Sequence, residues 1–272
     1  MRILVLLFAL LLAFPAMAQQ DRRGLPLQSG LSADARYLDC LAHAARAPAD
    51  AFEEALAWAS GGGAEPAQHC AAVALFHNGQ LEAAAYRLEQ LAIDMRLFAP
   101  ELRAEVLAQA GRAWLDARNP ARAAAAFSTA LELAPAQIEL WIDRAEAHAA
   151  AADYRAAIDD LNHAATLDAG RADIFAFRAA AYRFVGLLDL AFEDAERAVR
   201  MDPNLPEGWL ERAILQRQRG DTAAARRDFL QVLLLDPDGP AGEAARANIE
   251  RMELKLEEPA TPSPPVSSRH RR

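Results

Sequence analysis

The fold is decided by residues 138–205, which divide into two rows of 34 residues, IELWIDRAEAHAAAADYRAAIDDLNHAATLDAGR and ADIFAFRAAAYRFVGLLDLAFEDAERAVRMDPNL. Two further rows, starting at Ala104 and Pro206, align with them without a gap up to Gly239. The fourth residue of each row is large and the eighth is small, as in Leu107 and Gly111, Trp141 and Ala145, Phe175 and Ala179, and Trp209 and Ala213. This period indicates a repeat architecture, in which small residues let helices approach and large ones fill the space opposite.

Turn and capping residues divide each row into two helices. Asn119-Pro120, Asp153 and Asp221 are typical helix starts, and Gly186 and Gly220 are typical helix ends. The apolar content is mostly Ala and Leu, which favour helices over strands. Each row therefore predicts a helix, a tight turn and a second helix.

These rows resemble the tetratricopeptide-repeat family, whose 34-residue unit is a helix pair with a bulky fourth residue, small eighth and twentieth residues and a closing proline. The closing position holds Pro135, Pro203 and Pro237 in three of the four rows. The resemblance implies an all-α, right-handed superhelical solenoid of antiparallel helix pairs, with a C-terminal capping helix. In that family the first helix of every repeat lines a concave surface that takes a peptide or a partner's helix.

The pattern weakens on both sides of the four regular rows. We expect a signal peptide at residues 1–18, an N-terminal linker at 19–32, two divergent helix-pair repeats at 33–98, four regular repeats at 104–137, 138–171, 172–205 and 206–239, a capping helix at 240–258 and a disordered tail at 259–272. A terminal helix with a polar outer face is the cap that a solenoid needs.

The first eighteen residues have the pattern of a secretory signal. Arg2 is a positive start, residues 3–14 form an apolar run, and Ala16-Met17-Ala18 is typical of a signal-peptidase site. The run is too short to span a bilayer, and no cysteine follows the cleavage position to accept a lipid. We therefore expect a periplasmic or secreted protein with no integral membrane span after cleavage.

Composition and motifs argue against several functions. Asp and Glu number 38 against 29 Lys and Arg, a formal charge of −9, which is unfavourable for binding nucleic acid. The chain has no GxSxG, HExxH, GxGxxG or phosphate-binding loop, and Gly61-Gly62-Gly63 is interpreted as a linker. We expect no catalytic residues, no cofactor and no metal, and hence not an enzyme.

Two cysteines, Cys40 and Cys70, form an even number in a chain with an export signal, which predicts a disulfide. By the repeat register both lie on first helices of adjacent repeats. A metal site is the alternative, because His43 and His69 lie near the cysteines in sequence. However, His69 and Cys70 point about 100° apart on a helix, which makes a closed tetrahedral site awkward. Free thiols are the third possibility.

Arginine and aspartate recur together at the seventh and twenty-third places of a row. The pairs are Arg144 and Asp160, Arg178 and Asp194, and Arg212 and Asp228, whereas the first row has Ala110 and Ala126. Both partners are missing in the same row, so we interpret the pairs as structural ion pairs between the helices of one repeat. A ladder of arginines that binds an anionic ligand is the alternative.

The concave surface is the candidate binding site. The residues expected to line a partner-binding groove are Arg112, Leu115, Ile142, Glu146, Arg183, Phe184, Leu210, Ile214 and Arg217. The Lys and Asn set with which some members of the family bind a C-terminal carboxylate is absent. We expect a non-enzymatic interaction scaffold of the periplasm or cell envelope that holds a peptide or helix of a protein partner. Alternatives are an accessory subunit of an envelope enzyme complex and a small-ligand binder that uses the same groove.

Overall fold

The structure is a computed structural model, which describes residue 31 and residues 34–257. The expected signal peptide and C-terminal tail lie outside the described residues, as does the expected linker apart from Leu31. In the described part of the chain, none of the helices has the length and apolar character to cross a bilayer.

Helices follow one another along the chain, and the residues described contain no strand. The N-terminal helices are α2 (Ala35–Arg46), α3 (Pro48–Trp58), α4 (Ala64–His77) and α5 (Leu81–Asp94). The middle helices are α6 (Pro100–Asp116), α7 (Pro120–Leu133), α8 (Ile138–Ala150) and α9 (Tyr154–Leu167). The C-terminal helices are α10 (Ala172–Phe184), α11 (Leu188–Met201), α12 (Pro206–Gln218), α13 (Thr222–Leu235) and α14 (Pro240–Glu257).

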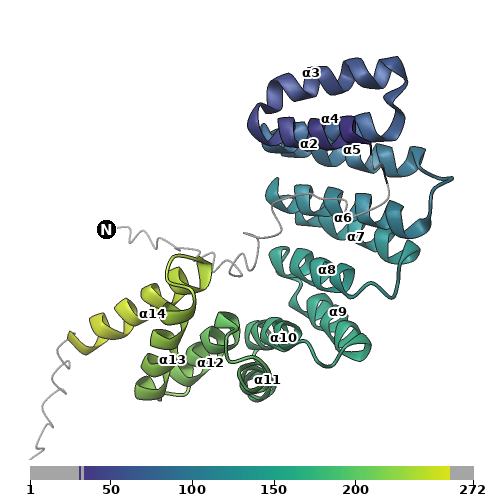
Figure 1. Ribbon diagram of the computed structural model, residues 1–272. Helices are drawn as coiled ribbons and strands as arrows, with labels where there is room; N and C mark the ends of the chain where they lie inside the picture. The colour runs from purple at the N-terminus through teal and green to yellow at the C-terminus, as the bar shows by residue number, and fades with distance from the viewer. Residues whose placement is uncertain (1–30, 32–33, 258–272) are drawn as a thin grey trace, which may run out of the picture.

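The helices pack as consecutive pairs, and each pair contacts the next. The contacts within α6 and α7, α8 and α9, α10 and α11, and α12 and α13 exceed those between the second helix of one of these four pairs and the first helix of the next. Figure 1 shows the pairs stacked along a curved path from α3 to α14, with α8 and α10 on the inner side of the curve and α9 and α11 on the outer side. The expectation of an all-α solenoid of antiparallel helix pairs is confirmed.

Tight turns join the two helices of each pair. The Asn119, Asp153 and Asp221 side chains cap α7, α9 and α13 by accepting a backbone N–H three residues on, at 2.9 to 3.2 Å. The residue one place earlier has a positive φ in the turns with Asn119 and Asp153, where it is Arg118 and Ala152, and in the turn with Asp221, where it is Gly220. The turn geometry is therefore common to the repeats, although only some of them use glycine.

The core consists of alanines that bring helices together and a few aromatic rings that fill the remaining space. Phe127, Phe175 and Phe229 are almost fully buried. Gly111 shows how tight this packing is, because a Cβ at its position would lie 2.6 Å from the Phe127 ring. The small residue at the eighth place of this row is therefore required by the ring on the second helix.

The N-terminal helices are joined covalently. Cys40 on α2 and Cys70 on α4 form a disulfide, with their Cα atoms 6.2 Å apart. A π-helical turn at residues 59–63 joins α3 to α4, and Gly62 has a φ of 96° there. The glycine run is thus a connection between helices.

The C-terminal helix α14 covers the end of the stack. It contacts both α13 and α12, and it buries Ala241 and Ala245 against them. Asn248 is also buried, and its side-chain amide donates to the Ala244 carbonyl at 2.8 Å. The last helix pair is therefore not left with an open apolar face.

Candidate interaction surface

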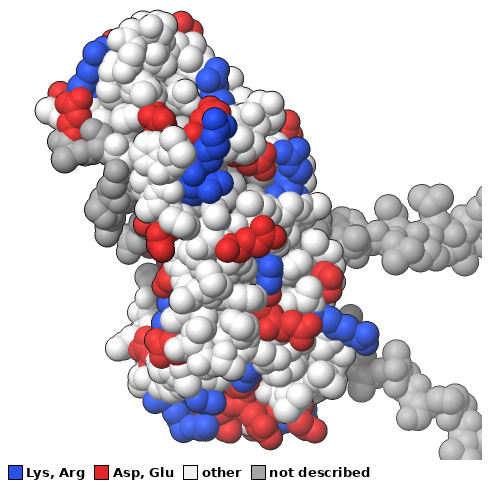
Figure 2. All heavy atoms as spheres, turned by 90° about the vertical axis from the view of Figure 1, so that its right-hand side faces the viewer, with Lys and Arg blue, Asp and Glu red and all other residues white. Residues whose placement is uncertain are grey.

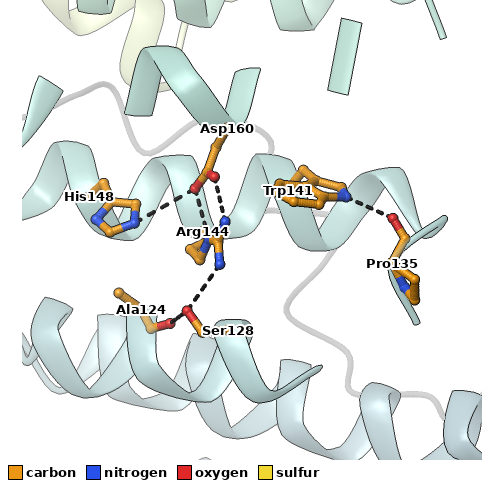
Figure 3. Close-up of polar contacts among 7 residues, drawn as sticks. All are labelled: Ala124, Ser128, Pro135, Trp141, Arg144, His148 and Asp160. Carbon is orange, nitrogen blue, oxygen red and sulfur yellow. Dashed lines mark hydrogen bonds and ion pairs between the residues drawn. The ribbon is translucent and has the colours of Figure 1, made fainter. Parts of the chain in front are cut away.

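Arg144 and Asp160 join the two helices of one repeat. Arg144 donates from Nε and Nη2 to the two carboxylate oxygens of Asp160, at 2.9 and 2.6 Å. Figure 3 shows Arg144 between Asp160 on α9 and Ser128 on α7, to whose hydroxyl it donates at 3.1 Å. His148 lies 3.7 Å from the same carboxylate (Figure 3). One arginine therefore connects three helices.

The same arrangement recurs in the next two repeats. Arg178 donates to both oxygens of Asp194 at 2.7 and 2.9 Å, and Arg212 does so to Asp228 at 2.7 and 3.0 Å. Arg178 also donates to Asn162 of the preceding repeat at 2.9 Å. Two parallel hydrogen bonds to a carboxylate are the geometry that guanidinium groups favour. These arginines have structural partners, which leaves little capacity for an anionic ligand.

Each of these arginines also lies over the ring of an aromatic residue three places earlier in the sequence. The guanidinium groups of Arg144 and Arg212 lie 4.9 and 4.6 Å from the ring centres of Trp141 and Trp209. Each indole N–H donates to the carbonyl of the proline that closes the preceding row, which is Pro135 for Trp141 (Figure 3). The bulky fourth residue is thus a contact between repeats as well as a space-filling group.

A second set of polar contacts, which the sequence analysis missed, runs from one repeat to the next. The sixth places of the first, second and fourth rows hold Gln109, Asp143 and Glu211, which are all buried. Arg112 donates to Asp143 at 2.7 and 3.2 Å. Arg183 donates to the two oxygens of Glu211 at 2.7 and 3.0 Å. Polar residues at the sixth place of three rows, two of them acidic, are the sequence signal that could have indicated these contacts.

Gln109 takes part in the same kind of contact with the divergent N-terminal repeats. Its carbonyl oxygen lies 2.7 Å from Nε2 of His69, and Nδ1 of His69 lies 2.8 Å from the Tyr37 hydroxyl. Because a carbonyl oxygen only accepts, Nε2 carries the proton and Nδ1 accepts from Tyr37. Burial lowers the pKa of His69 to about 4, which keeps the ring neutral.

These contacts correct part of the predicted groove. Arg112 and Arg183 were expected to face a partner, but they are bound to Asp143 and Glu211 of the following repeat. The side chain of Arg183 is only 10% exposed, and that of Glu211 is 2% exposed. A charged group brought into a packed interface needs such a partner, because an unpaired buried charge is costly.

The apolar part of the prediction also changes. Ile142 and Leu210 were expected to be exposed anchors, but they are core residues with exposures of 4% and 1%. Ile142 belongs to a buried cluster with residues of α9 and α10, and Leu210 belongs to one with residues of α13 and α14. Leu115 and Ile214 are half-buried and pack at the edge of the core.

Phe184 and Glu146 are the other half-buried groove candidates. The Phe184 ring stacks on Tyr154 of the preceding repeat, with centres 4.3 Å apart. The Arg183 guanidinium lies 4.5 Å from the Phe184 ring centre. Phe184 therefore contributes to the boundary between repeats and still presents part of its surface.

Arg217 differs from the other arginines of this surface. Its Nε is buried and has no hydrogen-bond partner. Burial lowers the pKa of Arg217, and the positive charges of Arg251 and Arg183 lower it further. Arg217 is thus a cation beside other cations, at the end of the inner surface where α12 meets α14.

Comparisons with known proteins agree with this geometry. A family model described as the tetratricopeptide repeat matches residues 180–250. This part of the chain matches the family, and the structure as a whole has the tetratricopeptide-repeat fold. No protein of curated function matches the chain in sequence.

Solved structures share the tetratricopeptide-repeat fold of this chain. The crystal structure of MamA is 19% identical, with a TM-score of 0.52 over 61% of this chain and 94% of that one. MamA residues 41 to the end from Desulfovibrio magneticus RS-1 are 20% identical, with a TM-score of 0.52 over 61% of this chain and 91% of that one. YrrB, described as a TPR protein with an unusual peptide-binding site, is 17% identical, with a TM-score of 0.50 over 76% and 99% of the two chains.

The N-terminal tetratricopeptide-like repeats carry an open cavity of about 620 Å³ between α2 and α3. It is lined by the basic residues Arg36 and Arg46, by the acidic residues Asp39 and Glu54, and by His43 and Trp58. His43 bonds to Glu54 at 3.0 Å, and the Arg36 guanidinium lies 4.8 Å from the Trp58 ring centre. His43 and His69 therefore have other partners, and among the described residues no cluster of His, Cys, Asp and Glu has the geometry of a metal site.

Charges on the outside of the tetratricopeptide-repeat stack are mixed. On the face drawn in Figure 2, Lys and Arg are interspersed with Asp and Glu, and broad uncharged areas separate them. Binding to a nucleic-acid backbone needs a concentrated field of positive charge, which this face does not offer.

Proposed function

We propose that this tetratricopeptide-repeat protein is a non-enzymatic interaction scaffold that holds a segment of a partner protein on the inner side of its curve. The observation that carries this proposal is the combination of groups that stay partly exposed on the inner-side first helices. Leu115, Phe184 and Ile214 offer apolar surface, and Arg217 offers a charge. Apolar anchors framed by charge are the usual way in which a groove binds a helix or an extended segment.

The buried acidic residues are hydrogen-bonded to arginines, which supports a binding role rather than catalysis. A general acid or base must be able to reach a substrate proton. The buried acids Asp143, Asp160, Asp194, Glu211 and Asp228 each accept hydrogen bonds from an arginine. Their carboxylates are therefore used to hold helices together. The description of YrrB as having a peptide-binding site is compatible with the same type of role here.

The proposed place of action is the periplasm or another compartment outside the cytoplasmic membrane. It rests on the signal-like residues 1–18, and a disulfide between Cys40 and Cys70 is compatible with an oxidising compartment. Fractionation of the source cells, with N-terminal sequencing of the mature chain, tests this. A chain recovered from the cytoplasm with residues 1–18 intact contradicts it.

Site-directed photo-crosslinking in the native cells tests the binding surface. A photoreactive side chain is placed at Leu115, Glu146 or Ile214 on first helices, and at Arg155 or Glu193 on second helices as a control. We expect adducts with the same partner from the first-helix positions only. Adducts only from Arg155 or Glu193 would move the binding surface to the outer side of the curve.

The same preparation separates the alternatives. If the chain is an accessory subunit, the crosslinked partner is itself an enzyme whose activity changes on binding. If the chain binds a small ligand, the first-helix positions give no protein adduct, and a bound small molecule is released when the purified chain is denatured.

A further inference from the structure

Arg217 occupies the position in its repeat that Arg183 occupies in the repeat before. The two residues are 34 apart in sequence, and each lies at the twelfth place of its row. Arg183 is neutralised by Glu211, which lies 28 residues further on in the next first helix. The residue 28 positions after Arg217 is Ala245 on α14, and it is fully buried. The capping helix therefore supplies a methyl group where the previous repeat boundary has a carboxylate.

The capping helix brings a positive charge to this region as well. Arg251 on α14 lies close enough to Arg217 for its charge to lower the pKa of Arg217. Arg251 makes a long hydrogen bond of 3.5 Å to Asn248 on the same helix. Nε of Arg217 is buried without an acceptor, and so is the side-chain oxygen of the adjacent Gln216 without a donor. Arg217 thus lies within the electrostatic reach of a second guanidinium group, and its buried Nε has no acceptor among the described residues.

Such an arrangement costs stability unless something compensates it. A cation that is partly removed from water and placed beside another cation is unfavourable. A carboxylate from outside would restore the contact that Glu211 makes with Arg183, and it would separate the two positive charges. The geometry of the preceding boundary makes the missing group a carboxylate, because the guanidinium fork of Arg183 receives two carboxylate oxygens there.

We propose that Arg217 and Arg251 form a carboxylate-binding subsite at the C-terminal end of the inner surface, which receives an acidic side chain or the C-terminal carboxylate of the partner segment. This inference rests on the proposed function and specifies the chemistry of the partner. Because the subsite lies between the last regular repeat and the capping helix, it also gives the bound segment a direction, with its acidic end at α14. The capping helix then has a role in binding as well as in covering the core.

The subsite is tested with small probes on the purified full-length mature chain, so the partner need not be known. The Nε–Hε signal of Arg217 is assigned in NMR spectra from its loss in the Arg217→Gln variant. The probes are N-acetylglutamate α-amide, whose only carboxylate is that of the side chain, N-acetylalanine, whose only carboxylate is C-terminal, and inorganic phosphate. All titrations are made at constant ionic strength, because a screened charge effect is not saturable binding.

We expect a saturable downfield shift of the Arg217 signal with at least one carboxylate probe. The probe that binds more tightly shows whether the subsite prefers an acidic side chain or a C-terminal carboxylate. Arg251→Gln should weaken this binding at least threefold. Arg155→Gln on α9 is the matched control and should leave it unchanged. Ala245→Glu should abolish the shift by supplying the missing carboxylate internally. If Ala245→Glu does not fold, the Arg251→Gln comparison carries the test.

The absence of a saturable shift with both carboxylate probes overturns the proposal, and so does tighter binding of phosphate. Photo-crosslinking at Leu115, Glu146 and Ile214 reports on the proposed function separately. If those positions still capture the partner while the titrations are silent, the subsite is wrong and the scaffold role stands. If the titrations saturate but the partner is captured only from the outer helices, the subsite stands and the proposed groove is wrong.

Discussion

Arg183 and Glu211 form a two-fold hydrogen-bonded ion pair across the boundary between the third and fourth regular repeats, at 2.7 and 3.0 Å. The two side chains are 10% and 2% exposed, so water screens their interaction weakly. The pair joins the first helices of consecutive repeats, whereas Arg178 and Asp194 join the two helices of one repeat. One set of ion pairs therefore joins the helices within a repeat, and another joins consecutive repeats.

We predict strong coupling between Arg183 and Glu211. Replacing either one by Ala should destabilise the chain by about 3–5 kcal/mol, because the remaining charge is left buried. The double variant should lose much less than the sum, and urea unfolding of all four proteins gives the coupling energy.

Arg219 and Asp189 provide the matched control for this cycle. They are 3.0 Å apart but 40% and 97% exposed, so their coupling should be about 0–1 kcal/mol. Equal coupling in both cycles would show that the burial of Arg183 and Glu211 has no energetic consequence.

We predict that His69 makes the N-terminal half sensitive to acid. Its pKa is about 4 in the folded chain, against an ordinary value of 6.5. A lowered pKa means that the unfolded chain binds the proton first. The contribution of neutral His69 is therefore complete above about pH 6.5 and is lost as the pH falls from there toward 4. At 1.36 kcal/mol per pKa unit, the loss is on the order of 3 kcal/mol.

His69→Gln provides the comparison, because Gln cannot become charged in this range. Its free energy of unfolding should depend less on pH between 6.5 and 4 than that of the original chain. Parallel pH profiles for the two proteins would mean that His69 titrates normally in the fold.

We predict that reduction destabilises the N-terminal repeats. The disulfide closes a segment with a sequence separation of 30 residues, which is worth about 3.5 kcal/mol in the chain-entropy account. Mass spectrometry should show that reduction adds two hydrogen atoms, and thermal unfolding should shift to lower temperature with reductant. The Cys40→Ala, Cys70→Ala double variant should unfold at the same temperature with and without reductant. Alkylation of both thiols in the untreated chain would contradict the bridge.

We predict that Gly111→Ala destabilises the first regular repeat. Alanine should favour the helix by about 1 kcal/mol. However, its Cβ would lie 2.6 Å from the Phe127 ring, which is fully buried and cannot move freely. Overpacking of this kind costs about 1–3 kcal/mol, so a net loss is expected in urea unfolding. Adding Phe127→Leu to Gly111→Ala should recover part of it, and a more stable Gly111→Ala variant would mean that the ring moves aside easily.

The sequence by itself determined the helix-pair solenoid, because a small or large residue recurring every 34 positions leaves few other ways to bury an apolar face. It also indicated the contacts of Arg144, Arg178 and Arg212, since both partners lie within one row at a constant spacing of sixteen residues. When both residues of a contact belong to one repeat, the pair recurs at the same places in each row, and this recurrence can be recognised in a single sequence.

Only the tertiary structure decided how the inner surface is divided between packing and binding. Arg112 and Arg183 reach the sixth place of the next row from different places in their own rows, over 31 and 28 residues, so no constant spacing reveals them. Whether Ile142 or Leu210 is exposed depends on how the second helix of the same repeat and the helix that follows it pack against the residue, which is a property of the stack. For the same reason Arg217 is distinguished from Arg183 only by the helix that follows it, where Ala245 takes the place of an acid.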